Sequence, residues 1–396
     1  MRNAKLITRI CAALAFAEIA TGCAGGGAAF APAGTSASQS AEAVGGLQAI
    51  ARRVVSRNTM GSLTGYKLSL APSNMPLELH PSWMRLRAHD DGATKDIVWA
   101  TNFGFPVPIG EYAVPNESNN GPLCEAPGAY GVNLLGTDPK GNLWVPTTGP
   151  SGTPGEMYVQ EYSCSGSFGP SVADANGEPA DVAFDSKGNT YVGNNIDYWW
   201  TNFGCCYIVS GTVNIYNASG TLIGNLTDPS FFAPHPPGFD TWNQLVGVAV
   251  DADDNCYVSH QDDTGGGEVV EFPGCKPANH GKILAGPHPW EPGKPEFDAA
   301  GNLLVTDWAA SYYYRVWYLS VYAPPYDGPA IKTFPMYGPA LTCPLSSDQT
   351  RLYCGNFWNG TVDVYSYKAG KYLYSFNNGL QTYGVEGVAV APAGSR

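Results

Sequence analysis

Apolar and polar positions alternate along much of this chain, in pairs of short runs that flank a polar turn. In residues 245–260, the runs LVGVAV and CYVSH surround the turn DADDN, a pattern that predicts two antiparallel strands joined by a hairpin. The same pattern covers residues 131–146, 179–194, 292–307 and 339–356, and a half copy covers residues 384–396. We therefore expect a chain built from repeated β-units.

The spacing of the turns indicates which repeat architecture the units form. The turn positions are Asp138, Asp185, Asp251, Asp298 and Ser346, at intervals of 47, 66, 47 and 48 residues. Two further strand-like runs lie between successive copies, as in residues 211–216 and 221–226, so each unit provides four strands. Periods of about 40 to 50 residues with four strands are typical of the blades of a β-propeller.

The two ends of the repeat region complement each other. The C-terminal half copy stops after one strand, near Val390, whereas residues 96–102 (DIVWATN) and 110–114 look like a second and a third strand without a first. If the segment around Trp99 pairs with the segment around Val390, the termini share one blade and the ring has no exposed sheet edge. The sequence thus predicts an all-β, six-bladed propeller over residues 96–396.

The turns share an acidic or hydroxyl residue. An Asp at this place accepts hydrogen bonds from backbone amides two residues on, and a following Gly or Asn tolerates positive φ. We expect the turn carboxylates to have this structural role. Calcium binding by residues 251–255 (DADDN) is the alternative, because oxygen-rich loops suit that ion, although the loop lacks the glycine and the distant glutamate of an EF-hand.

The first 95 residues differ from the repeats. Residues 1–22 combine a basic start, a short apolar run and small residues directly before Cys23, which predicts an export signal. The segment resembles the cleavage region of bacterial lipoproteins, in which Cys23 would carry the lipid and hold the protein at the cell envelope; an ordinary secretory signal is the alternative. Residues 23–95 are expected to form a flexible tether followed by a segment that packs on the propeller rim.

Net charge narrows the choice of partners. The formal net charge is −13, and it becomes −15 once residues 1–22 are removed. An acidic surface without a basic stripe repels phosphate backbones, so we expect no nucleic-acid partner. No run after the signal reaches the roughly 18 apolar residues that cross a bilayer. Membrane attachment would therefore depend on the lipid alone, and the chain is expected to be a monomer.

Eight cysteines remain beyond the predicted signal and lipidation site, an even number that favours disulfides in an exported protein. Cys343 and Cys354 are equidistant from a turn, so they should face each other across two strands and form a bond. Cys256 and Cys275 are likewise symmetric about residues 265–266 and are expected to pair. The other four allow three pairings, of which we favour a bond from Cys164 to Cys205 or Cys206 rather than to Cys124.

The D-x-x-G-N turn followed by an aromatic residue and Val, as in residues 138–145 (DPKGNLWV), carries a resemblance. These units resemble the NHL-repeat and SMP-30/gluconolactonase-like six-bladed propellers of exported bacterial proteins, over about 300 residues. The resemblance implies the propeller fold. It implies little about activity, because one fold hosts many functions.

Residues just before each first strand should line the mouth of the central channel. In the lactonase branch of the resembled group, Glu, Asn and Asp side chains hold a divalent metal in that channel. In this chain the candidate channel-mouth residues, chosen only because they lie next to the start of each first strand, are Tyr130, Glu178, Asp181, Gln244, His288, Trp290, Glu291, Tyr337, Tyr383 and Glu386. We expect a solvated acidic channel without chemistry and no firmly assigned cofactor, because no P-D-G-M or S-N-G-L motif of the lactonases precedes any first strand. A divalent cation such as Ca²⁺ among these carboxylates is the alternative.

Aromatic residues gather in the longest interval between turns. Residues 194–207, which include Trp199 and Trp200, and residues 228–242 interrupt the second unit as expected loops, and residues 311–318 add a third aromatic segment. Aromatic side chains on surface loops suit the binding of a sugar or a protein. Mutual packing that stiffens the loops is the alternative.

Two classes of function follow from these features. The first is a non-enzymatic, lipid-anchored protein of the cell envelope that binds a protein or a carbohydrate, and this is the one we expect. The second is a metal-dependent hydrolase or lactonase, or an elimination enzyme similar to the streptogramin lyases, whose GNLWF-type strand is echoed by residues 141–145. An elimination needs an acid and a base close together, and in the sequence only His288 and Glu291 offer such a pair.

Overall fold

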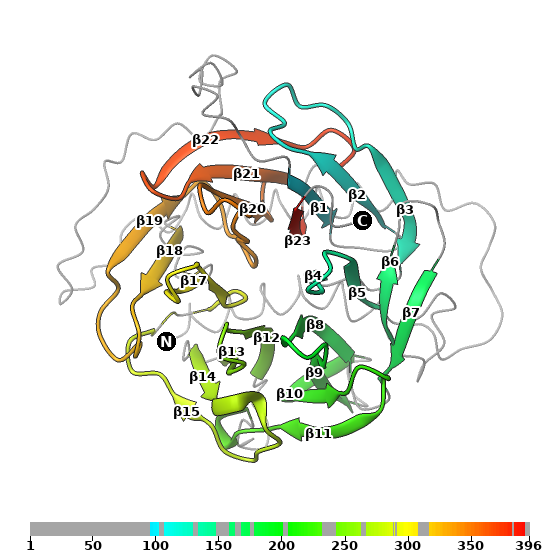
Figure 1. The fold of residues 1–396 in the computed structure, drawn as a ribbon, viewed down its shortest axis with the longest axis vertical. Helices are drawn as coiled ribbons and strands as arrows, with labels where there is room; N and C mark the ends of the chain where they lie inside the picture. Colours follow the sequence, from blue (N-terminus) through cyan, green and yellow to red (C-terminus); the bar gives the residue numbers. More distant parts are fainter. Residues whose placement is uncertain are drawn as a thin grey trace. The chain divides into compact units, whose positions relative to one another are not determined.

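The computed structural model shows six β-sheets arranged in a ring within the part of the chain that it describes (Figure 1). The described residues are 96–102, 107–129, 134–147, 158–162, 168–174, 178–200, 205–231, 243–262, 267–287, 289, 291–307, 317–381 and 384–392. The predicted signal, Cys23 and the tether of residues 23–95 lie outside these ranges. Within them, no helix is long and apolar enough to cross a membrane.

Four of the sheets are formed by strands that follow one another in the chain, and we number these blades one to four. Blade one contains β4 (Gly136–Thr137), β5 (Leu143–Thr147), β6 (Tyr158–Tyr162) and β7 (Phe168–Ala173). Blade two contains β8 (Glu178–Phe184), β9 (Thr190–Trp200), β10 (Cys205–Tyr216) and β11 (Leu222–Leu226). Blade three contains β12 (Asn243–Val250), β13 (Cys256–Asp262), β14 (Glu268–Phe272) and β15 (Lys282–Ile283). Blade four contains β16 (Glu296–Phe297), β17 (Leu303–Asp307), β18 (Trp317–Tyr322) and β19 (Lys332–Met336).

Blade five has three strands, β20 (Arg351–Asn356), β21 (Thr361–Ser366) and β22 (Lys371–Phe376). The place of its first strand is taken by the segment before β20, which makes a single antiparallel bridge between Leu345 and Leu352. Two short 3₁₀ turns complete the described elements, η3 (Pro229–Phe231) after blade two and η4 (Pro273–Cys275) inside blade three.

The sixth sheet, the closing blade, joins the two ends of the repeat region. It contains β23 (Val385–Pro392), β1 (Asp96–Asn102), β2 (Val107–Ala113) and β3 (Cys124–Ala129), in that order. Trp99 lies opposite Ala389, and Val98 lies opposite Val390. The prediction that these two segments pair and close a six-bladed ring is therefore confirmed, although the third strand begins three residues earlier than expected.

Polar contacts fasten the closing blade to blade five. The Asp96 carboxylate accepts hydrogen bonds from the backbone N and the hydroxyl of Ser347, at 2.9 and 2.5 Å. On the outer side, the Asn119 side-chain oxygen accepts hydrogen bonds from the backbone N of Asn377 and of Asn378, at 2.8 and 2.9 Å. These contacts join residues more than 250 positions apart, so they stabilise the closed ring rather than a local turn.

The hydrophobic core is divided among the six interfaces between neighbouring blades. Alternate residues of one strand face opposite neighbours: Leu303 and Val305 of β17 pack with blade three, whereas Leu304 packs with blade five. The inner strands therefore bury apolar side chains on both faces, whereas outer strands such as β15 are exposed. This arrangement explains why runs such as LVGVAV are almost continuously apolar instead of strictly alternating.

The turn carboxylates have the structural role that the sequence predicts. In blade two, Asp185 Oδ1 accepts hydrogen bonds from the backbone N of Lys187 and Asn189, at 2.9 and 2.8 Å. Its Oδ2 accepts bonds from Asn189 Nδ2 and the Tyr191 hydroxyl, at 2.7 and 3.0 Å. Asp138 and Asp251 repeat this pattern with Trp144 and Tyr257 as the aromatic partners. The residue three after each Asp has positive φ, which explains the Gly of the motif; it is +79° at Gly188.

Both predicted disulfides are present. Cys343, in the segment before β20, faces Cys354 of β20, and their Cα atoms are 4.2 Å apart. Backbone hydrogen bonds lie on either side of this pair, from Tyr353 N to Pro344 O and from Gly355 N to Thr342 O. Cys256 bonds to Cys275, with Cα atoms 4.9 Å apart. In the strand register Cys256 lies opposite Phe272, and Cys275 reaches Cys256 through the turn η4. The predicted pair is therefore right, but the predicted register is wrong. These disulfides indicate an oxidising compartment outside the cytoplasm.

The remaining cysteines are only partly covered. Cys124 is also disulfide-bonded. The favoured bond from Cys164 to Cys205 or Cys206 concerns side chains outside the described part of the chain.

The prediction of an aromatic loop at residues 194–207 is wrong for most of that segment. Strand β9 continues to Trp200, and β10 begins at Cys205, so the two strands form a long hairpin. Trp199 lies opposite Cys206, and Trp200 lies opposite Cys205. Aromatic residues favour extended backbone next to a paired strand. The prediction of an inserted loop did not take this preference into account.

Candidate functional site

A buried ion pair lies among the innermost strands of the ring. Lys294, two residues before β16, directs its Nζ to Asp181 Oδ1 of β8 at 2.7 Å. The same Nζ donates to the carbonyl oxygens of Leu135 and Val182, each at 3.2 Å. The backbone of Lys294 crosses Gly247 of β12, where a Cβ would lie 2.7 Å from the Lys294 Cα. Lys294, in the segment that leads into blade four, thus contacts residues of blades one, two and three.

This pair decides what the Asp181 carboxylate can do. Asp181 is fully buried, and its second oxygen accepts a hydrogen bond from the backbone N of Val248 at 2.8 Å. Burial raises the pKa of Asp181, and the Lys294 ammonium opposes that rise. Both carboxylate oxygens are engaged, one by the Lys294 ammonium and the other by the Val248 amide. Asp181 is therefore not available as a ligand for a channel metal while Lys294 is in place.

The other axial carboxylates differ from Asp181 in their surroundings. Burial raises the pKa of Glu296 to about 7; Lys294 opposes this rise and Asp181 adds to it. Glu386 lies in β23 and is 7% exposed, and its backbone oxygen accepts a hydrogen bond from the Thr342 hydroxyl at 2.9 Å. Within the described residues, no group of three or more His, Cys, Asp and Glu side chains is placed to hold a metal ion.

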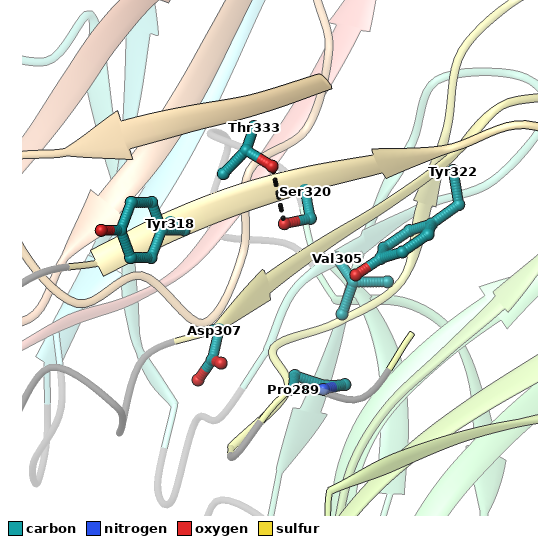
Figure 2. A pocket seen from close by; sticks show the side chains of 7 residues that line it. All are labelled: Pro289, Val305, Asp307, Tyr318, Ser320, Tyr322 and Thr333. Atoms are coloured by element: carbon teal, nitrogen blue, oxygen red, sulfur yellow. Dashed lines mark hydrogen bonds between the residues drawn. The ribbon is translucent and has the colours of Figure 1, made fainter. Parts of the chain in front are cut away.

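An open pocket of about 210 Å³ lies on blade four (Figure 2). We call it the blade-four pocket, and its lining residues are Pro289, Val305, Asp307, Tyr318, Ser320, Tyr322 and Thr333. Tyr318, Ser320 and Tyr322 are alternate residues of β18 and so share one face of the strand. Val305 and Tyr322 also pack with residues of blade three, so the pocket opens on the face that turns toward blade three.

The pocket combines rings, hydroxyl groups and one carboxylate. Asp307, the last residue of β17, lies directly opposite Tyr318 in the strand register. The Ser320 and Thr333 hydroxyl oxygens are 3.5 Å apart across β18 and β19 (Figure 2). Burial raises the pKa of Tyr322, which keeps its hydroxyl protonated as a hydrogen-bond donor. Apolar side chains, aromatic rings and polar groups therefore line the same pocket.

Glu291 of the predicted channel mouth lies next to this pocket. Its backbone N donates to Asp307 Oδ1 at 3.3 Å. Burial raises the pKa of Glu291 to about 8, and the Asp307 charge adds to the rise. Glu291 is therefore mostly protonated at neutral pH.

A different His–Glu pair from the one considered in the sequence lies in blade three. His260 Nε2 and Glu268 Oε2 are 3.3 Å apart, on residues directly opposite in β13 and β14. The His260 side chain is 4% exposed, and its ring makes an edge contact with Phe231 at 5.2 Å between centroids. The His260 ring is packed in the interface between blades two and three, so we assign it a structural role.

Several predicted site residues lie wholly or partly outside the described part of the chain. Tyr130, His288, Trp290 and Tyr383 lie outside the described residues. Glu178 and Gln244 lie in β8 and β12 by their backbone, and Trp199 and Trp200 lie in β9, but their side chains are outside the described part. Tyr337 packs against Tyr365 and Tyr372, and its backbone N donates to the Tyr365 hydroxyl at 2.9 Å.

Two site features were missed in the sequence. Lys294 was not predicted as a channel residue, because mainly carboxylates and aromatic residues were expected at the channel mouth. The alternation in WYLSVY (Trp317–Tyr322) could have identified the pocket face, since every second residue from Tyr318 is polar or aromatic. An aromatic loop was predicted over residues 311–318 instead, which covers only Trp317 and Tyr318 of this strand.

Comparisons with known proteins support the fold. No protein-family model and no curated protein matches the sequence. A solved protein of unknown function from Bacteroides caccae is similar with a TM-score of 0.51 at 12% identity, covering 75% of this chain and 99% of that one. A nidogen/laminin complex structure is similar with a TM-score of 0.49 at 12% identity, covering 75% and 98%. The periplasmic gluconolactonase of Pseudomonas aeruginosa is similar with a TM-score of 0.47 at 13% identity, covering 75% and 99%. Identities this low show a shared fold and leave activity undetermined.

Proposed function

We propose that this chain is a non-enzymatic propeller that binds a carbohydrate at the blade-four pocket. The observation that carries the proposal is the single face of β18, where Tyr318 and Tyr322 flank the Ser320 hydroxyl and Asp307 stands beside Tyr318. Tyrosines offer an apolar ring face together with a polar edge, which matches the mixed surface of a sugar. Hydroxyl and carboxylate oxygens at the rim can accept hydrogen bonds from sugar hydroxyl groups.

The dimensions of the pocket favour a small group as its ligand. A volume of about 210 Å³ lies below the roughly 300–1,000 Å³ of pockets that enclose drug-sized molecules. Tyr318 and Tyr322 are four residues apart on an extended strand, which corresponds to about 13 Å. Tyr322 is only 8% exposed, so the pocket suits one ring of a longer saccharide against Tyr318, with the rest of the saccharide in solvent.

The ion pair of Asp181 with Lys294 favours a ligand-binding function over metal-dependent hydrolysis. A lactonase-type centre requires carboxylates that can turn to a divalent ion, and Asp181 is instead paired with Lys294 at 2.7 Å. We therefore place the ligand on blade four and not in the central channel.

We further propose that the protein is exported and held at the cell envelope by a lipid on Cys23. The two disulfides support export, because they persist in oxidising compartments. Metabolic labelling with a radioactive fatty acid tests the anchor: the native chain should incorporate label, and Cys23→Ser should not. Label in the Cys23→Ser chain would show that the lipid is attached elsewhere.

Calorimetric titration of the full mature chain tests the binding proposal. The probes are oligomers of N-acetylglucosamine, of β-linked glucose and of α-linked glucose. At least one should bind, and Tyr318→Ala should weaken that binding at least tenfold, equivalent to about 1.4 kcal/mol. Ile331→Ala is the matched control, because Ile331 is an exposed residue of the same blade outside the pocket. Equal affinity of the Tyr318→Ala and native chains would place the ligand elsewhere.

If no oligosaccharide binds, the carbohydrate proposal is wrong. Binding of an envelope protein that Tyr318→Ala abolishes would then assign the pocket to a protein partner.

A further inference from the structure

One row of residues in the blade-four pocket combines an apolar side chain with two hydroxyl groups. Val305 lies opposite Ser320 in the register of β17 and β18, and Ser320 lies opposite Thr333 in the register of β18 and β19. Side chains at such paired positions point to the same face of a sheet, and all three line the pocket. The row therefore crosses the pocket from β17 to β19, the last strand of the sheet (Figure 2).

The row changes from apolar to polar along its length. Val305 is 2% exposed, and the buried Pro289 lines the pocket as a second apolar side chain. Ser320 is half-buried, and Thr333 is exposed. Their hydroxyl oxygens are 3.5 Å apart, at the long limit of a hydrogen bond, so both groups can exchange this contact for bonds to a ligand. A ligand group that fits the row has a small apolar end next to a hydrogen-bonding part.

An acetamido group on a sugar ring has this combination. Its methyl group is apolar, and its amide has one donor N–H and one acceptor oxygen. A hydroxyl group can donate one hydrogen bond and accept two, so Ser320 and Thr333 can satisfy both parts of the amide. Successive positions on one face of a strand are about 7 Å apart. A sugar ring that packs on Tyr318 would therefore place a short substituent next to Ser320.

We propose that the blade-four pocket selects sugars that carry an acetamido group. The methyl group lies against Val305 and Pro289, and the amide bonds to the hydroxyl groups of Ser320 and Thr333. This inference rests on the carbohydrate proposal and narrows it to one substrate class. Burial of one methyl-sized group corresponds to a preference of about fourfold, and the hydrogen bonds of the amide add to it.

Calorimetric titration of the full mature chain with matched trisaccharides tests this selection. The probes are the β-1,4-linked trimers of N-acetylglucosamine, of glucosamine and of glucose, which differ only in the group on the second carbon of each ring. The N-acetylated trimer should bind at least about tenfold more tightly than either of the other two.

Two isosteric variants test whether the row makes this selection. Thr333→Val removes the exposed hydroxyl, and Val305→Thr replaces one methyl group of the apolar end by a hydroxyl. Each should reduce the preference for the N-acetylated trimer over the glucose trimer at least about threefold. Because Thr333 is exposed, its variant keeps the test valid if Val305→Thr does not fold. Thr221→Val is the matched control, since Thr221 and Ser219 form a similar hydroxyl pair at 3.3 Å on blade two, and it should leave the preference unchanged.

The outcomes separate this inference from the proposal on which it rests. If no trimer binds, the carbohydrate proposal itself fails. If the glucose trimer binds as tightly as the N-acetylated one and Tyr318→Ala weakens both, the carbohydrate proposal stands and the inference is overturned. Tighter binding of the glucosamine trimer also overturns it, because the pocket would then select an ammonium group. A preference for the N-acetylated trimer that neither Thr333→Val nor Val305→Thr changes overturns the assignment to this row.

Discussion

The repeated turn carboxylate offers a quantitative test of how this propeller is held together, and Asp185→Ala is the sharpest case. Asp185 is 3% exposed and accepts four hydrogen bonds, from two backbone amides, the Asn189 side chain and the Tyr191 hydroxyl. Alanine removes both acceptor oxygens, and with them all four hydrogen bonds, without adding a group that replaces them. The Tyr191 side chain is 2% exposed, so its hydroxyl would lose its partner inside the interface of blades two and three.

The expected cost follows from these contacts. A hydrogen bond whose donor regains water contributes about 0.5–1.5 kcal/mol, and a buried donor left without a partner costs about 1–3 kcal/mol. The turn amides can regain water, whereas the Tyr191 hydroxyl cannot. We expect Asp185→Ala to lower the free energy of unfolding by about 3 kcal/mol.

Urea denaturation of the full chain, followed by tryptophan fluorescence, measures this loss. Asp253→Ala is the control, because Asp253 has an exposed side chain in the equivalent turn of blade three, and it should change stability by less than about 0.5 kcal/mol. In a Tyr191→Phe background, Asp185→Ala should cost about 1–2 kcal/mol less, since no hydroxyl is stranded. Equal losses in both backgrounds, or equal losses for Asp185→Ala and Asp253→Ala, would refute the proposed role of the carboxylate.

Three further perturbations test other parts of the structure. Lys294→Met should destabilise the chain by about 3–5 kcal/mol in urea denaturation, because it leaves the buried Asp181 carboxylate without its counter-ion; Lys294→Met/Asp181→Leu should recover most of that loss, and no recovery would contradict the ion-pair account. Replacing both Cys343 and Cys354 by Ser should cost about 3 kcal/mol, as expected for a loop of 11 residues, and a thermal midpoint that does not change would argue against the bond. Asp96→Ala should speed amide hydrogen exchange in β1 and β23 but not in β5; uniform acceleration would mean that Asp96 does not act on ring closure.

Much of the fold could be predicted from the sequence because it depends on local signals that recur. The D-x-x-G-N motif requires an acceptor at its first residue and, in the Asp185 copy, a residue with φ of +79° at Gly188, so each copy marks a turn. The incomplete unit at Val390 and the unpaired strand at Trp99 predicted the closing blade, because an exposed edge strand has N–H and C=O groups that can pair with another strand. The hairpin of β9 and β10 was not foreseen, because its aromatic residues fit a binding loop as well as a strand.

The candidate sites were harder to predict, because they depend on contacts between distant parts of the chain. Asp181 was identified as an axial carboxylate, yet its partner Lys294 lies 113 residues later and no periodicity links the two. Glu291 was identified as a mouth residue, whereas its neighbour Asp307 was seen only as the end of a strand. Tyr318 was expected at the end of an aromatic loop, and no role was predicted for Tyr322, because the side of β18 that faces a pocket is decided by packing against blade three.

A crystal structure of the full mature chain with the tightest-binding oligosaccharide of the panel tests the central claim most directly. The account predicts sugar density in the blade-four pocket, with a ring against Tyr318 and a hydroxyl group within hydrogen-bond distance of Asp307. Sugar bound instead in the central channel, with the pocket occupied only by water, would contradict it.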